Sequence, residues 1–199
     1  ILFQFTDYRM MGNYHYMNHI IGLAFLFLLD KENTLRLFVV MFYFFSGTIK
    51  FNTDWLSGTS MLQTPVVTGK ILEFLCAYAI IIELFWSPFL LSKYRGLKWA
   101  AFLHLILFHI FSWHIVGYFY PVLMFLILSI FIWRVEAFAW PKDVMARFFI
   151  IIFVCAQIYP AVFEPHSSMN GRGRILSLNM LDSTSVCETH FVIRNKKST

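Results

Sequence analysis

Six apolar stretches, separated by short polar ones, dominate the first 163 residues of the chain. We place them at about 14–29, 35–49, 71–92, 99–119, 121–133 and 148–163. Polar or basic sequence ends most of them, such as DKEN after the first and KYRGLK after the third. Runs of this length favour helices that cross a membrane, for which about 20 residues are needed. The first two runs are short, so their helices would have to tilt or extend into the flanking sequence.

The pattern changes after about residue 164. The stretch NGRGR favours a tight turn, and ILSLNM and HFVIRN alternate apolar and polar positions as strands do. The sequence therefore predicts an all-α, multi-pass membrane bundle of about six helices over 1–163. The start of an extramembrane β-rich segment is predicted over 164–199. A β segment this short cannot bury a core alone, so we expect it to pair with sequence outside this chain or to pack on the helices.

Composition supports a membrane protein. The chain is 59% hydrophobic and only 14% charged, whereas soluble domains carry about 25% charged residues. The basic residues lie mostly between the apolar runs, so a nucleic-acid-binding surface is not expected. The three cysteines share no spacing motif, so we expect neither a disulfide framework nor a zinc site. The chain begins at Ile1, and we expect it to be part of a longer protein.

The distribution of basic residues predicts an orientation. The loops after the first, third and fifth runs hold Lys31, Arg36, Lys93, Arg95, Lys98, Arg134, Lys142 and Arg147. The opposite ends hold only Arg9, Lys50 and Lys70. Because positive loops stay in the cytoplasm, Lys50 and the C-terminal segment are predicted to face the lumen or the exterior.

Lys50 has two interpretations. A lysine at the end of an apolar helix can bury its stem and keep its ammonium group in water. Alternatively, a dry pocket can keep the amine uncharged, so that it acts as a base. If the helix continued beyond Lys50, Asp54 would lie beside it. That carboxylate would favour the charged amine and would argue against a base, unless Asp54 points elsewhere.

The histidines were weighed as metal ligands. His15 and His19 are four residues apart and share a helical face, a spacing found in metal pairs, but no third ligand with a motif is visible. His104, His109 and His114 recur every five residues and therefore fan around one helix instead of converging. No metal site is predicted. Each of these histidines, taken by itself, is a candidate either for a hydrogen bond between helices or for a functional role.

Glu83 lies deep in the third apolar run. A carboxyl group at that depth is costly to expose to lipid, so it is predicted to face the interior of the bundle. It could be a protonated side chain that is hydrogen-bonded to a neighbouring helix, or a group that handles protons.

The stretch SGTIKFNTDWLSGTSM at 46–61 resembles the signature of the vitamin K-dependent γ-glutamyl carboxylase family. That family shares its membrane domain with the horizontally transferred transmembrane (HTTM) proteins. The matching positions are Gly47, Lys50, Asp54, Trp55, Gly58 and Met61.

Three further stretches resemble the family in the same order. NYHYMNHIIGLAFLFLLD places the family histidine on His15, or on His19 if the alignment shifts. FHIFSWHIVGYFYP supplies His109 and Gly117 in a region about two residues shorter than the family pattern. RILSLNMLDSTSVCETHFVIRN resembles the start of the family's lumenal β domain, with Leu178 where the family usually has tryptophan.

The resemblance implies a reaction. Lys50 would be the base that deprotonates reduced vitamin K or another quinone, whose reaction with O2 drives removal of a glutamate γ-proton and addition of CO2. His15 would assist near the glutamate and CO2. The candidates for the quinone pocket are Asp54, Trp55, Gly58, His109 and Gly117.

A second hypothesis is a non-catalytic, HTTM-like membrane subunit or scaffold of a larger complex. The expected partners are the lipid bilayer, a protein substrate bearing glutamates and other membrane subunits. The resemblance implies the endoplasmic reticulum membrane for a eukaryotic carboxylase, and otherwise a bacterial inner membrane or an organelle membrane.

Overall fold

The computed structural model describes residues 13–61, 65–116, 119–133, 137–163 and 176–178. The helices are α2 (Asn13–Phe27), α3 (Lys31–Ile49), α4 (Thr53–Leu56), α5 (Lys70–Ile81), α6 (Arg95–Val116), α7 (Phe119–Leu128), α8 (Ile130–Trp133) and α9 (Val144–Phe163). A π-helical turn, Ile82–Trp86, and a 3-10 turn, Ser87–Leu91, continue α5. This part of the chain contains no strand, and the predicted helical character is confirmed.

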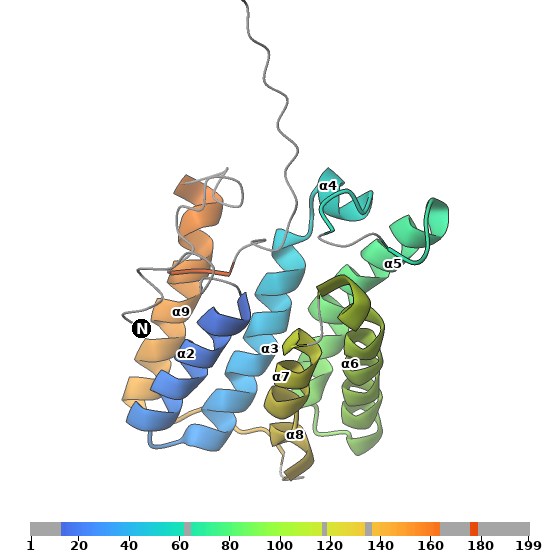
Figure 1. Ribbon diagram of the computed structural model, residues 1–199. Coiled ribbons are helices and arrows are strands. Elements are labelled where there is room, and N and C mark those ends of the chain that lie inside the picture. The colour runs from blue at the N-terminus through green and yellow to red at the C-terminus, as the bar shows by residue number, and fades with distance from the viewer. Residues whose placement is uncertain (1–12, 62–64, 117–118, 134–136, 164–175, 179–199) are drawn as a thin grey trace, which may run out of the picture.

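The long helices run alternately up and down (Figure 1). The C-terminal ends of α3 and α6 therefore lie at the same end of the molecule as the start of α5. The loops with the predicted basic clusters, between α2 and α3 and between the 3-10 turn and α6, lie at the opposite end. This alternation agrees with the predicted topology, whereas the side of the membrane that each end faces remains a prediction.

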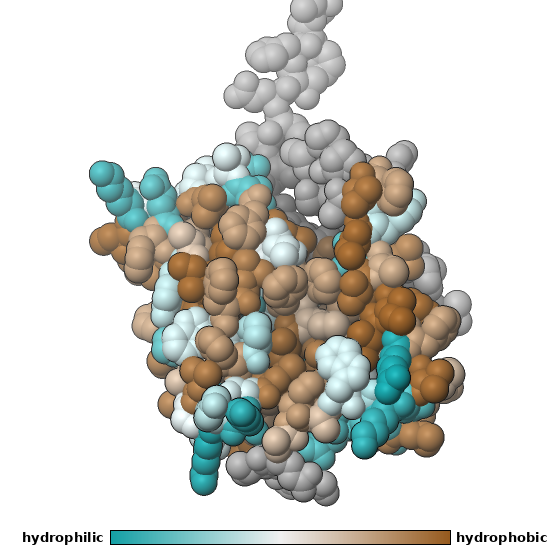
Figure 2. All heavy atoms as spheres, turned by 180° about the vertical axis from the view of Figure 1, so that it is seen from behind, coloured by the Kyte–Doolittle hydropathy of each residue, from teal (hydrophilic) through white to brown (hydrophobic). Residues whose placement is uncertain are grey.

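Two helical stretches, Lys70–Leu91 and Arg95–Ile115, are long and apolar enough to cross a membrane. Tyr120–Ile132 and Val144–Pro160 are shorter apolar helices. Large apolar side chains cover much of the outer surface (Figure 2), and Phe111 is 80% exposed. Contiguous apolar surface of this kind commonly marks a face that contacts other molecules or a membrane.

Aromatic rings pack α9 against α3. The ring of Phe153 meets Phe38 and Phe42 edge-to-face, with centroids 5.3 Å apart in both pairs. Such pairs add about 0.5–1.5 kcal/mol beyond the apolar area that they bury. They hold α3 among its neighbours, because α3 also contacts α2 and the continuation of α5.

The predicted β-rich segment, 164–199, falls outside the described residues except for 176–178, which form a turn and bend. Leu178 is buried, and its N–H donates a 2.9 Å hydrogen bond to Gln157 Oε1 of α9. The Tyr16 hydroxyl of α2 donates a 2.7 Å bond to the carbonyl of Leu176. These three residues therefore pack on the helices, which is one of the two arrangements expected for the segment.

The π-helical turn has a local cause. A proline has no N–H, so Pro88 cannot donate to a carbonyl in the preceding turn. The N–H of Ser87 bonds five residues back to Ile82, and the Ser87 hydroxyl donates a 2.5 Å bond to the carbonyl of Glu83. Isolated π turns of this type are frequent at functional sites. Here the turn carries Glu83.

Candidate functional site

A cavity of about 1170 Å³ lies between the end of α3, α4, α5, α6 and α7. Its walls are mostly apolar and aromatic side chains, as in many sites for small lipophilic molecules. Ser46, Lys50 and Glu83 form a polar cluster in this wall. A cavity of this composition offers a non-polar ligand a large contact surface and a single cluster of charge.

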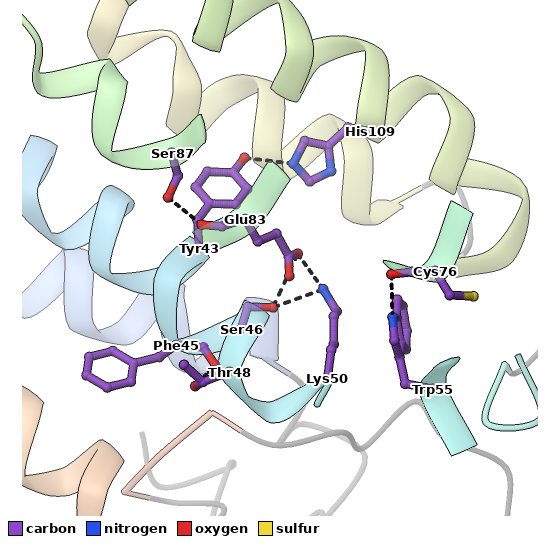
Figure 3. Close-up of polar contacts among 10 residues, drawn as sticks. All are labelled: Tyr43, Phe45, Ser46, Thr48, Lys50, Trp55, Cys76, Glu83, Ser87 and His109. Carbon is purple, nitrogen blue, oxygen red and sulfur yellow. Dashed lines mark hydrogen bonds and ion pairs between the residues drawn. The ribbon is translucent and has the colours of Figure 1, made fainter. Parts of the chain in front are cut away.

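Lys50, Glu83 and Ser46 point toward one another (Figure 3). The Lys50 ammonium forms an ion pair with Glu83 Oε1 and donates to Ser46 Oγ at 3.3 Å. The Ser46 hydroxyl donates to the same carboxylate oxygen at 3.4 Å. The side chains of Lys50 and Glu83 are 11% and 1% exposed. The pair therefore joins the end of α3 to the π-helical turn in a place that bulk water hardly reaches.

Asn52 sets the position of Lys50 by ending one helix and starting the next. Its Nδ2 donates to the carbonyl of Ile49, the last residue of α3, at 2.9 Å. Its Oδ1 accepts from the N–H of Trp55 at 2.7 Å and caps α4. Asparagine is among the preferred residues for this role. The chain therefore turns directly after Lys50.

This turn corrects the expectation for Asp54. The helix of Lys50 ends at Ile49, so the four-residue spacing between Lys50 and Asp54 no longer places them side by side. Asp54 is exposed on α4, and the carboxylate that pairs with Lys50 is Glu83.

Two aromatic rings flank the amine. The Lys50 Nζ atom lies 4.9 Å from the ring centroid of Trp55 and 5.8 Å from that of Phe108. Trp55 is held in place because its Nε1–H donates a 3.1 Å bond to the carbonyl of Cys76 in α5. Cation–π contacts contribute about 0.5–2 kcal/mol each, so both rings help to hold the Lys50 side chain in the wall of the cavity.

Two glycines of the signature permit close packing around this cluster. A Cβ on Gly47 would lie 2.8 Å from Leu84 Cγ and 3.1 Å from Glu83 Cβ. Gly47 therefore lets α3 approach the π-helical turn closely enough for the ion pair. Gly58 has a φ of +77°, a conformation that glycine adopts easily, and a Cβ there would lie 2.5 Å from Leu72. Gly58, a candidate for the quinone pocket, packs against the cavity-lining Leu72 and is not itself among the residues that line the cavity.

His109 lies behind the wall. It is fully buried, and its Nε2 shares a 2.7 Å hydrogen bond with the hydroxyl of Tyr43. Its ring centroid is 5.1 Å from that of Phe108 and 5.7 Å from that of Tyr120, which both line the cavity. His109 Nδ1 has no hydrogen-bond partner among the described residues. His109 therefore contacts the wall but not the space inside it.

The remaining candidate site residues are Trp55, His15 and Gly117. Trp55 lines the cavity, whereas His15 does not, and the His15 ring is tilted against that of Tyr14 at the start of α2 with centroids 4.1 Å apart. Gly117 lies outside the described residues. Within the described part of the chain, no three His, Cys, Asp or Glu side chains cluster in a way that could hold a metal ion.

The sequence identified Glu83 as facing the bundle interior, which is confirmed, but not its pairing with Lys50. The two residues are 33 positions apart, and no spacing rule connects them. One signal was present: Glu83 lies inside an apolar run and Lys50 at the end of another, and buried charges are normally paired.

No family model, no curated protein and no solved structure matches this chain.

Proposed function

We propose that this chain is part of a multi-pass membrane enzyme in which Lys50, paired with Glu83, acts on a reduced quinone, as the matching lysine does in the vitamin K-dependent γ-carboxylases that the sequence resembles. The observation that carries this proposal is the buried ion pair in the wall of a large apolar cavity. Ionisable groups that a cleft holds out of bulk water are candidates for proton chemistry. On the resemblance, Lys50 is the base and CO2 is added to a glutamate of a protein substrate.

The residues present fit a quinone. The cavity is apolar and larger than the roughly 300–1000 Å³ that is usual for sites of drug-sized ligands, which leaves room for a hydrocarbon tail. Trp55 and Phe108 would hold the aromatic ring, and the Lys50–Glu83 pair would contact its hydroxyl group. When bound, the reduced quinone would supply the reaction with O2, while the chain binds, orients and excludes water.

A membrane location agrees with the surface. Two helical stretches have the length and composition to cross a bilayer, and further apolar helices pack beside them. The exposed side chains of these helices are largely apolar, whereas the buried ones include Glu83 and His109. Polar residues inside and apolar residues outside are the arrangement that a bilayer favours. We therefore extend the proposal to a chain in which all six apolar runs cross the bilayer.

The experiment is a carboxylation assay on the full chain in lipid vesicles. The assay supplies chemically reduced vitamin K, a glutamate-rich peptide and labelled bicarbonate. The native chain should label the peptide, and Lys50→Ala should remove the label. Lys70→Ala is the matched control, because Lys70 is an exposed lysine on α5 and should leave the label unchanged. A native signal no higher than that of Lys50→Ala would overturn the carboxylase proposal.

A non-catalytic scaffold is the second candidate. The observation that favours it is that the same ion pair joins α3 to the π-helical turn, and one buried pair can serve architecture alone. A chain that incorporates no label, yet loses stability when Lys50 is replaced, would support this candidate.

A further inference from the structure

The wall of the cavity is incomplete between α5 and α6. Three apolar side chains that line the cavity are also widely exposed: Leu75 of α5 at 44%, and Leu107 and Phe111 of α6 at 53% and 80%. On the same wall of α5, Leu72 and Cys76 are buried. A lining side chain that is exposed to this degree lies where no other element covers it. Leu75, Leu107 and Phe111 therefore mark an edge at which the cavity meets the outer surface, here called the side opening.

The packing of the helices explains the side opening. α6 packs against α7 and against the π-helical and 3-10 turns that continue α5, whereas α5 itself packs mainly on α3, α4 and its own continuation. The two helices therefore approach each other at one end and separate toward the other. Figure 1 shows the start of α5 leaning away from the rest of the bundle. The side opening lies in the part where α5 and α6 are apart.

The level of the side opening follows from the helix ends. The start of α5 and the end of α6 lie at the same end of the molecule (Figure 1). Leu75 lies five positions after the start of α5, and Phe111 five positions before the end of α6. Both side chains therefore lie roughly 7–8 Å from those ends, and Leu107 lies about one turn deeper. In the membrane arrangement proposed above, the side opening faces the lipid chains.

We propose that the cavity opens sideways into the bilayer between α5 and α6, and that the hydrocarbon chain of a lipid-borne ligand lies in this side opening while its polar head lies beside Lys50. The inference rests on the proposed function and on the membrane location, because it places the tail of the ligand of the same site. Leu107 directly precedes Phe108, whose ring centroid is 5.8 Å from the Lys50 Nζ atom. The side opening therefore leads to the polar cluster.

The side chains at the opening select a hydrocarbon. Leu75, Leu107 and Phe111 carry no polar side-chain atoms, so a polar chain that lay among them would lose its hydrogen bonds with water and gain none. A hydrocarbon chain has no such cost. It would also pass from the bilayer into the cavity without crossing water, and the removal of apolar surface from water is what binds such chains elsewhere.

A second exposed edge of the cavity offers the competing arrangement. Val66, in the loop between α4 and α5, lines the cavity and is 83% exposed. A chain that left the cavity there would emerge at the end of the helices and not at their sides. The two arrangements therefore place the tail of the ligand against different residues, which substitutions can separate.

Two naphthoquinones that differ only in their tail test the inference. Menadione has no tail, and its tailed counterpart carries a chain of several isoprenoid units. The full chain is prepared in detergent, and the binding of each probe is followed by quenching of tryptophan fluorescence. Partition into micelles is the same for every variant, so it cancels in the ratio of variant to native affinity.

Phe111→Gln puts an amide into the side opening. Binding of the tailed probe should weaken by about tenfold, the effect expected when roughly two methylene groups lose their apolar contact. Binding of menadione should change by less than about twofold. Phe148→Gln on α9 is the matched control, because Phe148 is 56% exposed and is not among the lining residues, and it should leave both affinities unchanged. Phe111→Leu keeps the opening apolar and should bind the tailed probe as the native chain does.

Leu75→Gln, on the facing helix, should repeat the selective loss, so that the result does not depend on the folding of one variant. Unchanged binding of the tailed probe in both glutamine variants, or a loss that menadione shares equally, overturns the inference. A selective loss in Val66→Gln in their place would put the tail at the end near α4 and also overturns it. In these cases the native chain still binds both probes, and the proposed function stands. If the native chain binds neither probe, the proposed function fails as well.

Discussion

The Lys50–Glu83 pair predicts strong energetic coupling, which a double-mutant cycle measures. Lys50→Met leaves a carboxylate that is 1% exposed without its ion-pair partner, with only the 3.4 Å bond from Ser46. Removing one partner of a buried pair costs about 3–5 kcal/mol. The free energy of unfolding should therefore fall by about that amount.

The reverse change should cost less. Glu83→Leu leaves the Lys50 ammonium, which is 11% exposed and keeps its 3.3 Å bond to Ser46. Its flexible stem also lets the charge move toward water. We expect a loss of about 1–3 kcal/mol, which is the cost of one unsatisfied group.

The double variant Lys50→Met/Glu83→Leu removes both charges and fills their place with apolar groups of similar volume. Such replacements are often neutral or stabilising, so its stability should lie within about 1 kcal/mol of the native chain. The coupling free energy should then be at least about 3 kcal/mol, well above the roughly 0.5 kcal/mol within which the effects of independent sites add.

The assay is equilibrium unfolding in mixed detergent micelles, followed by tryptophan fluorescence. Lys70→Met and Glu73→Leu, both exposed on α5, provide the matched cycle, in which the effects should simply add. If the effects of Lys50→Met and Glu83→Leu also add within about 0.5 kcal/mol, the two side chains are not a buried pair and the site as described is wrong.

Three other changes test neighbouring contacts. Gly47→Ala should cost about 1–3 kcal/mol through overpacking, because the new Cβ would lie 2.8 Å from the Leu84 side chain. Gly22→Ala is the control: a Cβ there has nothing within 4 Å, so this variant should show no loss of stability in thermal unfolding. Tyr43→Phe removes the 2.7 Å bond to His109 and should lower the free energy of unfolding by about 1–3 kcal/mol, measured by denaturant titration. Asn52→Ala should cost about 0.5–2 kcal/mol by removing a helix cap, and Asn52→Asp should recover most of that loss in the same titration.

The helices were predictable because long apolar runs leave few alternatives. The boundaries of the helices were harder to predict, as the segment after α5 shows. Pro88 alone signals a break, but the choice of a π-helical turn depends on Ser87 bonding back to Glu83, a contact of side-chain geometry that periodicity does not contain. The turn that results contains Glu83.

The candidate site was predicted in part for similar reasons. Lys50 and Trp55 come from one continuous stretch of sequence, and the structure places both on the cavity. The sequence left the position of Asp54 open, because it depends on whether the helix continues past Lys50; the helix ends at Ile49, and Asn52, three residues before Trp55, is a recognisable cap. The pairing of Glu83 with Lys50 could not be predicted, because it depends on which helix packs beside α3. That packing is a tertiary contact between residues 33 positions apart.

Photo-crosslinking tests the central claim, that the cavity beside the Lys50–Glu83 pair is the ligand site. A naphthoquinone with a diazirine in its tail is bound to the full chain in vesicles. The sample is irradiated, and the adducts are mapped by mass spectrometry. Adducts should fall on lining residues such as Trp55, Cys76 and Phe108 and should disappear with excess unlabelled quinone. Adducts confined to exposed residues of α9 such as Phe148 and Ile151, and insensitive to competitor, would contradict it.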